Sequence, residues 1–102
     1  MLNDLAGWLH AQLDNAARDA SADHEPGCAV NQTRDADPTD PDECTCRVRP
    51  RLLDIAARRR LVDDYVASSV LEDAFAAGLE LAVRDLALAY ADRGGYHDEW
   101  RP

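Results

Sequence analysis

HEPGCAVNQTRDADPTDPDECTC, residues 24–46, holds all three cysteines of this 102-residue chain and almost no large apolar side chains. Its four candidate ligands follow the spacing H-x3-C-x15-C-x-C and are His24, Cys28, Cys44 and Cys46. Histidine and cysteine in sets of four are the ligands of structural zinc sites. A connection of this length is rarely structureless inside a small domain. We therefore predict that one zinc ion organises it.

The same residues leave alternatives open. Three free thiols in a mobile loop, or a disulfide between Cys28 and one partner, would use the same cysteines. Asp23, His97 or His10 could replace His24 as the fourth ligand. Four protein ligands would close the coordination sphere, so the predicted site is structural and not catalytic.

The segments on either side of this loop have helical periodicity. A first helix is predicted over residues 3–21, with an apolar stripe at Leu5, Leu9, Leu13, Ala16 and Ala20. The loop follows over 22–49. A helical hairpin is predicted over 50–93, broken near Ser68-Ser69, where a serine offers a new N-cap, and ended by Gly94.

The hairpin carries three apolar stripes. They are Leu52, Ile55, Ala56, Val62 and Val66; Leu53, Ala57, Leu61 and Tyr65; and Leu71, Phe75, Leu79, Ala82, Val83, Leu86 and Tyr90. An aromatic tail, 94–102, completes the chain, and we expect Trp100 to pack near Tyr90. The sequence thus predicts one all-α domain, residues 1–102: a three-helix arrangement with a zinc-stapled loop between helices 1 and 2.

The formal net charge of −9 argues against general binding to phosphate backbones and suits a basic protein partner. One segment is an exception, because residues 47–60 carry six arginines and one acid. These are Arg47, Arg49, Arg51, Arg58, Arg59 and Arg60. They could form a docking patch for an acidic partner or a nucleic acid. The interpretation we favour is a solvated helix face with internal pairs such as Asp54–Arg58.

Several classes of protein are disfavoured. No apolar run reaches the ~18–20 residues of a membrane helix, and no secretory signal is evident, so we expect a soluble, cytoplasmic protein. No nucleophile elbow, Gly-rich phosphate loop or His-Glu-x-x-His motif is present. We therefore expect that the protein is not an enzyme.

Three stretches resemble a known family. They are LAGWLHAQLD (residues 5–14), RVRPRLLDIAARRRLVDDY (47–65) and LALAYADRGGYHDEWRP (86–102). Together they resemble a family of small proteins of actinobacteria and their phages that is named only as a domain of unknown function. The resemblance implies an origin and a layout but supplies no mechanism.

The leading hypothesis for function is a small zinc-binding accessory protein that acts by protein–protein contact. It would be phage- or prophage-linked and would modulate a host protein. The alternative is a nucleic-acid-linked role, either DNA binding by the arginines or acidic mimicry of DNA against a defence or transcription factor.

Overall fold

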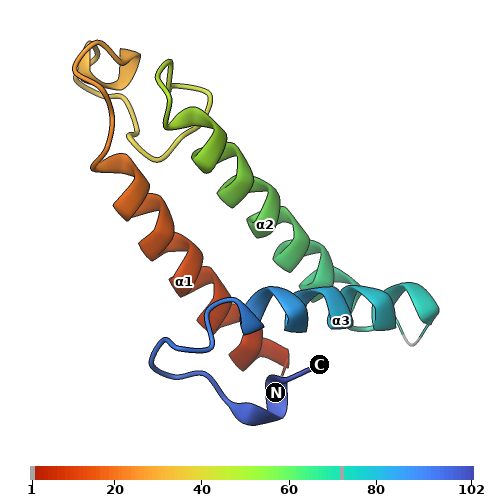
Figure 1. Ribbon diagram of the computed structural model, residues 1–102. Helices are drawn as coiled ribbons and strands as arrows, with labels where there is room; N and C mark the ends of the chain where they lie inside the picture. The colour runs from red at the N-terminus through yellow and green to blue at the C-terminus, as the bar shows by residue number, and fades with distance from the viewer. Residues whose placement is uncertain (1, 72) are drawn as a thin grey trace. The chain divides into compact units, whose positions relative to one another are not determined.

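The computed structural model describes residues 2–71 and 73–102, and in this part of the chain it is all-α (Figure 1). The three α-helices are α1 (Leu2–Ser21), α2 (Arg49–Ser68) and α3 (Ala74–Leu88). Two short 3₁₀ turns, η1 (Ala29–Asn31) and η2 (Asp98–Trp100), lie in the loop and in the tail. The predicted three-helix class is confirmed, and the described residues include no strand. No helix among them is long and apolar enough to cross a bilayer.

Helix α1 begins one residue before the predicted start, and the boundaries of α2 and α3 differ from the prediction at three places. Helix α2 begins at Arg49, one residue early, and ends at Ser68 as expected. Helix α3 begins after Asp73, whose carboxylate accepts a hydrogen bond from the backbone N–H of Ala76 at 2.9 Å. It ends at Leu88, so Gly94 does not end it. Gly95 instead has the positive φ, +91°, inside the tail.

The chain divides into two compact units, and α1 and α2 each contribute residues to both. One unit spans Leu13–Arg58. Its buried apolar side chains come from the end of α1, the loop and the start of α2; they are Leu13, Ala17, Ala20, Cys28, Val30, Cys44, Val48, Leu52 and Ile55. Ala17, and not the predicted Ala16, completes the buried face of α1. Leu53, predicted for a buried stripe, is exposed.

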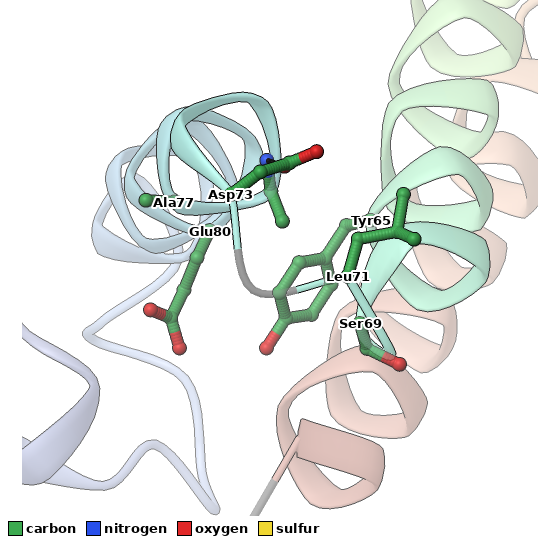
Figure 2. Close-up of a pocket in the computed structure, with 7 residues that line it drawn as sticks. Tyr65, Ser69, Leu71, Asp73, Ala77 and Glu80 are labelled. Carbon is green, nitrogen blue, oxygen red and sulfur yellow. Dashed lines mark hydrogen bonds between the residues drawn. The ribbon is translucent and has the colours of Figure 1, made fainter.

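The other unit comprises the residues up to Gln12 and Arg59–Pro102. Its buried side chains are Leu5, Ala6, Leu9, Val62, Tyr65, Ser68, Val83, Ala87 and Trp100. The predicted stripe of α3 is only partly right, because Phe75 and Leu71 are exposed whereas Val83 is fully buried. Val66 is exposed as well. A hollow of about 290 Å³ opens between α2 and α3 in this unit (Figure 2).

The tail folds onto its own unit. Trp100 is buried against the rings of Trp8, Tyr96 and His97, with ring centroids 4.4 to 5.7 Å apart. The indole N–H of Trp8 donates to the carbonyl of Gly94 at 2.9 Å. The predicted burial of Trp100 is therefore right, and Trp8 of α1 is an aromatic neighbour that was not predicted.

Candidate metal centre

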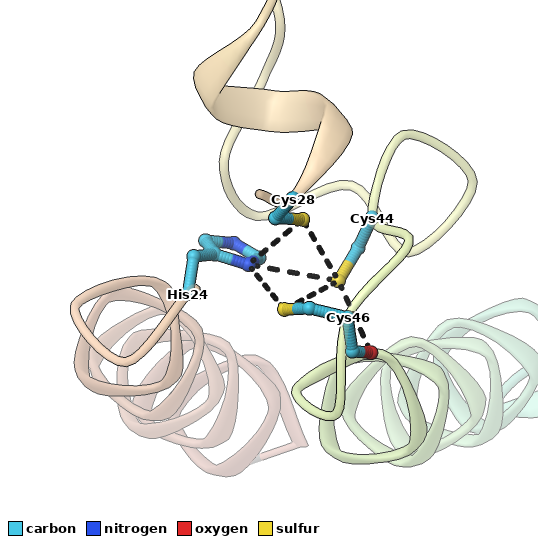
Figure 3. Close-up of side chains that lie close together, drawn as sticks. All are labelled: His24, Cys28, Cys44 and Cys46. Carbon is cyan, nitrogen blue, oxygen red and sulfur yellow. Dashed lines mark hydrogen bonds between the residues drawn. The ribbon is translucent and has the colours of Figure 1, made fainter. Parts of the chain in front are cut away.

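The four candidate ligands converge from two short turns within the unit 13–58 (Figure 3). Glu25-Pro26-Gly27 forms a turn closed by the N–H of Cys28, which donates to the carbonyl of Glu25 at 2.9 Å. Proline fixes φ in this turn, which helps the chain to reverse between His24 and Cys28. Cys28 then precedes η1, whereas Cys44 and Cys46 precede α2. One ligand atom from each residue lies within 4.8 Å of the other three.

The distances between the ligand atoms match a tetrahedron. Sγ of Cys44 lies 3.7 Å from Sγ of both Cys28 and Cys46. Nδ1 of His24 lies 3.4 Å from Sγ of Cys46 and 3.6 Å from the other two sulfurs. Around a tetrahedral zinc with ~2.3 Å bonds to sulfur and ~2.0 Å to nitrogen, the S···S and N···S edges would be ~3.8 Å and ~3.5 Å. The side chains are therefore spaced to hold one such ion.

The disulfide alternative is wrong. A disulfide bond is ~2.0 Å long, and the sulfurs of Cys28, Cys44 and Cys46 are all free. The interpretation as a mobile loop also fits poorly, since Cys28 and Cys44 are 1% and 2% exposed.

A second ring of contacts orients the histidine. Nε2 of His24 lies 2.6 Å from the carbonyl oxygen of Pro38. A carbonyl only accepts, so Nε2 carries the proton and Nδ1 directs its lone pair at the three sulfurs. The carboxylate of Asp37 accepts from the backbone N–H and the hydroxyl of Thr39, which holds this turn. These two bonds lower the pKa of Asp37.

The second turn is tied to the first through Thr45. Its backbone N–H donates to Sγ of Cys28 at 3.3 Å, and its hydroxyl accepts from the N–H of Ala29 at 2.9 Å. Sequence reasoning identified neither Thr45 nor Pro38. Thr45 lies inside Cys-x-Cys, so its contact with the site could have been predicted. The contact of Pro38 uses a backbone carbonyl, which every residue has, so the sequence does not indicate it.

The sulfurs differ in proton affinity. Burial raises the pKa of Cys28, but hydrogen bonds from the backbone of Val30 and Thr45 and from the other cysteines outweigh it and bring the pKa to about 6. Burial raises the pKa of Cys44 to about 11. Burial also acts to raise the pKa of Cys46, yet the hydrogen bond with His24 and those from the backbone lower it. The pKa of His24 is raised, first by its bond to Pro38 and then by Cys46. Cys28 is thus largely a thiolate at neutral pH before any metal binds.

The alternative fourth ligands have other partners. Asp23 pairs with Arg51 at 2.9 Å, and His10 lies 3.0 Å from Asp63. His97 stacks on Trp100. The structure accordingly groups His24, and none of these three, with the cysteines.

The arginines of the predicted patch make internal contacts. Arg47 lies 3.3 Å from Glu25, Arg49 donates to the carbonyl of Pro41 at 3.2 Å, and Arg58 pairs with Asp54 at 3.0 Å. The Asp54–Arg58 pair was expected from its i,i+4 spacing. A role of Arg47, Arg49, Arg51, Arg58, Arg59 and Arg60 in binding a partner stays a prediction.

Comparison with known proteins identifies the family and no activity. Neither the curated proteins nor the solved structures give a match. One family model matches residues 2–102 and so covers all three resembling stretches. The chain belongs to the "Family of unknown function (DUF6221)".

Proposed function

We propose that this chain is a zinc-stapled accessory protein that acts by contact with another protein. The assignment of zinc depends on five N···S and S···S distances. Each is within about 0.2 Å of the corresponding edge of a tetrahedral ZnS₃N centre. Oxygen-preferring cations such as Ca²⁺ and Mg²⁺ do not suit three sulfurs.

A structural role for the metal follows from its ligand set. Three cysteines and one histidine fill a tetrahedral sphere, so no position is left for a water molecule or a substrate. The loop that the metal would hold buries few apolar groups besides its cysteines, chiefly Val30 and Val48. Metal binding would therefore supply the free energy that orders this loop.

Contact with a protein is supported by the surface. Val70, Leu71, Phe75 and Leu81 are 83%, 49%, 66% and 53% exposed, and they follow one another along a single stretch of the chain. Large apolar side chains that are exposed close together in the sequence favour an interaction surface. The ion pairs of the arginines favour this function over nucleic-acid binding, because they already neutralise part of the basic segment. The resemblance implies an actinobacterial or phage origin, and for such a setting we propose a host protein as the target.

Elemental analysis tests the metal. Protein purified under reducing conditions should carry close to one zinc per chain. Cys44→Ser should lose it, and His24→Ala should bind it more weakly because water can replace the imidazole. His10→Ala is the matched control and should keep its zinc. A metal-free wild-type chain with three reactive thiols would refute the zinc staple, and the Co²⁺-substituted protein should have the absorption spectrum of a tetrahedral thiolate site.

A further inference from the structure

The hollow between α2 and α3 is lined by both apolar and acidic side chains (Figure 2). Leu71, Ala76 and Ala77 give it an apolar wall, while Asp73 and Glu80 place carboxylates on its rim. Its volume of about 290 Å³ is at the small end of ligand pockets. A site of this size suits one long side chain better than a cofactor.

A buried phenol lies in this hollow without a partner. Tyr65 is 2% exposed, and its hydroxyl makes no hydrogen bond among the described residues. Leaving a buried hydroxyl unsatisfied costs roughly as much as a lost hydrogen bond, so such groups are rare without a purpose. In Figure 2 the hydroxyl and the carboxylate of Glu80 point toward the same end of the hollow. Burial, and then the charge of Glu80, raise the pKa of Tyr65, so the phenol stays neutral and can donate or accept.

The segment of sequence that lines the hollow is acidic. Residues 61–88 contain six acids and one arginine, Arg84. Arg84 donates at 2.7 Å to the backbone of Glu99 and reaches Glu80 only at 3.5 Å, the outer limit of a hydrogen bond. The Glu80 carboxylate, with about four acceptor positions, therefore keeps capacity for a second cation.

We propose that this hollow binds an arginine side chain of the partner protein. The aliphatic stem would lie on Leu71, Ala76 and Ala77, and the guanidinium would donate to Glu80 and to the hydroxyl of Tyr65. Apolar neighbours of that arginine would cover the exposed Val70 and Phe75, which precede the lining residues Leu71 and Ala76 in the sequence. This inference rests on the proposed protein–protein function and specifies its partner as a basic segment with apolar residues beside an arginine.

A titration followed by nuclear magnetic resonance tests the site on the full-length, zinc-loaded chain. The probe is the peptide acetyl-Leu-Arg-Leu-amide, and its matched control carries citrulline, which has the shape of arginine without its charge. We expect the arginine peptide to shift the amide signals of Ser69, Leu71, Ala76 and Ala77. The citrulline peptide should shift them far less.

Variants assign the contacts. Tyr65→Phe should weaken binding roughly fivefold, the value of one hydrogen bond, and Glu80→Gln roughly threefold, as for a partly exposed ion pair. Ala77→Leu should block the hollow, and because Ala77 is exposed the larger side chain should not disturb the core. Asp85→Asn, which removes an exposed charge from α3 outside the hollow, is the control and should bind normally.

Three outcomes would overturn the proposal. They are equal binding of the citrulline peptide, unchanged binding by both Tyr65→Phe and Glu80→Gln, or dilution-dependent shifts of the same signals without peptide, which would mean that a second copy fills the hollow. All three are measured on protein that contains close to one zinc per chain. Failure of this site is thereby distinguished from failure of the metal centre.

Discussion

Gly95 shows how one residue fixes the tail. Its φ is +91°, and a Cβ added there would lie 2.9 Å from Nε1 of Trp8. An alanine would meet both a backbone conformation that L-residues rarely adopt and the indole that donates to Gly94. Gly95→Ala should lower the free energy of unfolding by about 1–3 kcal/mol, measured by denaturant titration of tryptophan fluorescence.

Gly94 supplies the matched control for that substitution. It has no positive φ, and a Cβ added there meets nothing within 4 Å. Gly94→Ala should therefore be near neutral. Equal losses of stability at the two positions would show that flexibility of the tail, and not the fit against Trp8, is what the glycines provide.

The three sulfurs make a separate prediction about protons. Metal ligands bind deprotonated, so zinc must displace any proton they hold. At pH 7 Cys44, with a pKa of about 11, still carries its proton, whereas Cys28, with a pKa of about 6, has largely lost it. Binding at pH 7 should release about one to two protons per zinc from the thiols, against the ~3 expected from ordinary thiols, besides any proton that His24, whose pKa is raised, gives up.

Calorimetry in buffers of different ionisation enthalpy measures this number. Because protons compete with zinc, the apparent affinity should fall as the pH falls from 8 toward the pKa of Cys28, near 6. Release of three protons from the thiols, after the proton of His24 is counted, would mean that no thiol is already a thiolate.

At the scale of the element, polar side chains play two different roles between α2 and α3: some satisfy the end of α2, and one caps the start of α3. Ser68 and Ser69 donate their hydroxyls to the carbonyls of Tyr65 and Val66, at 3.1 and 2.8 Å, so they satisfy the end of α2. The sequence predicted the break between α2 and α3 at the right place. It could not show that these hydroxyls bond to the preceding helix and do not cap the next one. Asp73, four residues further on, caps α3 instead.

Removing that cap should therefore weaken α3. Asp73→Ala leaves the N–H of Ala76 without its acceptor and should cost about 1 kcal/mol of stability, measured by denaturant unfolding followed by circular dichroism. Asp73→Asn keeps the capping oxygen and should cost little. A loss as large in Asp73→Asn would assign the effect to charge and not to the cap.

For the whole molecule, features that depend on residues close in sequence, or on a specific ligand chemistry, could be predicted, whereas contacts between distant segments could not. Helix periodicity is local, and it predicted three helices. Ligand chemistry is specific, and it singled out His24 and the three cysteines although up to 22 residues separate them. The contact between Trp8 and the tail joins residues 86 or more apart and depends on how the chain folds back. No periodicity marks such a contact, so the sequence did not predict Trp8 as a neighbour of Trp100.

The two units also predict how the chain responds when the metal is removed. The loop depends on the ligands for its order, whereas the unit with both tryptophans buries Leu5, Leu9, Val62 and Val83 without them. Chelation should therefore speed hydrogen exchange first in the loop. The amide of Cys28, which closes the first turn, and those of Ala29 and Thr45, which join the two turns, should exchange faster.

The amides of α3 and the fluorescence of Trp8 and Trp100 should change little under the same treatment. One equivalent of zinc should restore protection to the loop, and magnesium should not, because three thiolates and an imidazole suit zinc far better. Uniform loss of protection along the whole chain would mean that the two units unfold as one. An unchanged loop would mean that its hydrogen bonds hold it without the metal, and the zinc would then have no structural role.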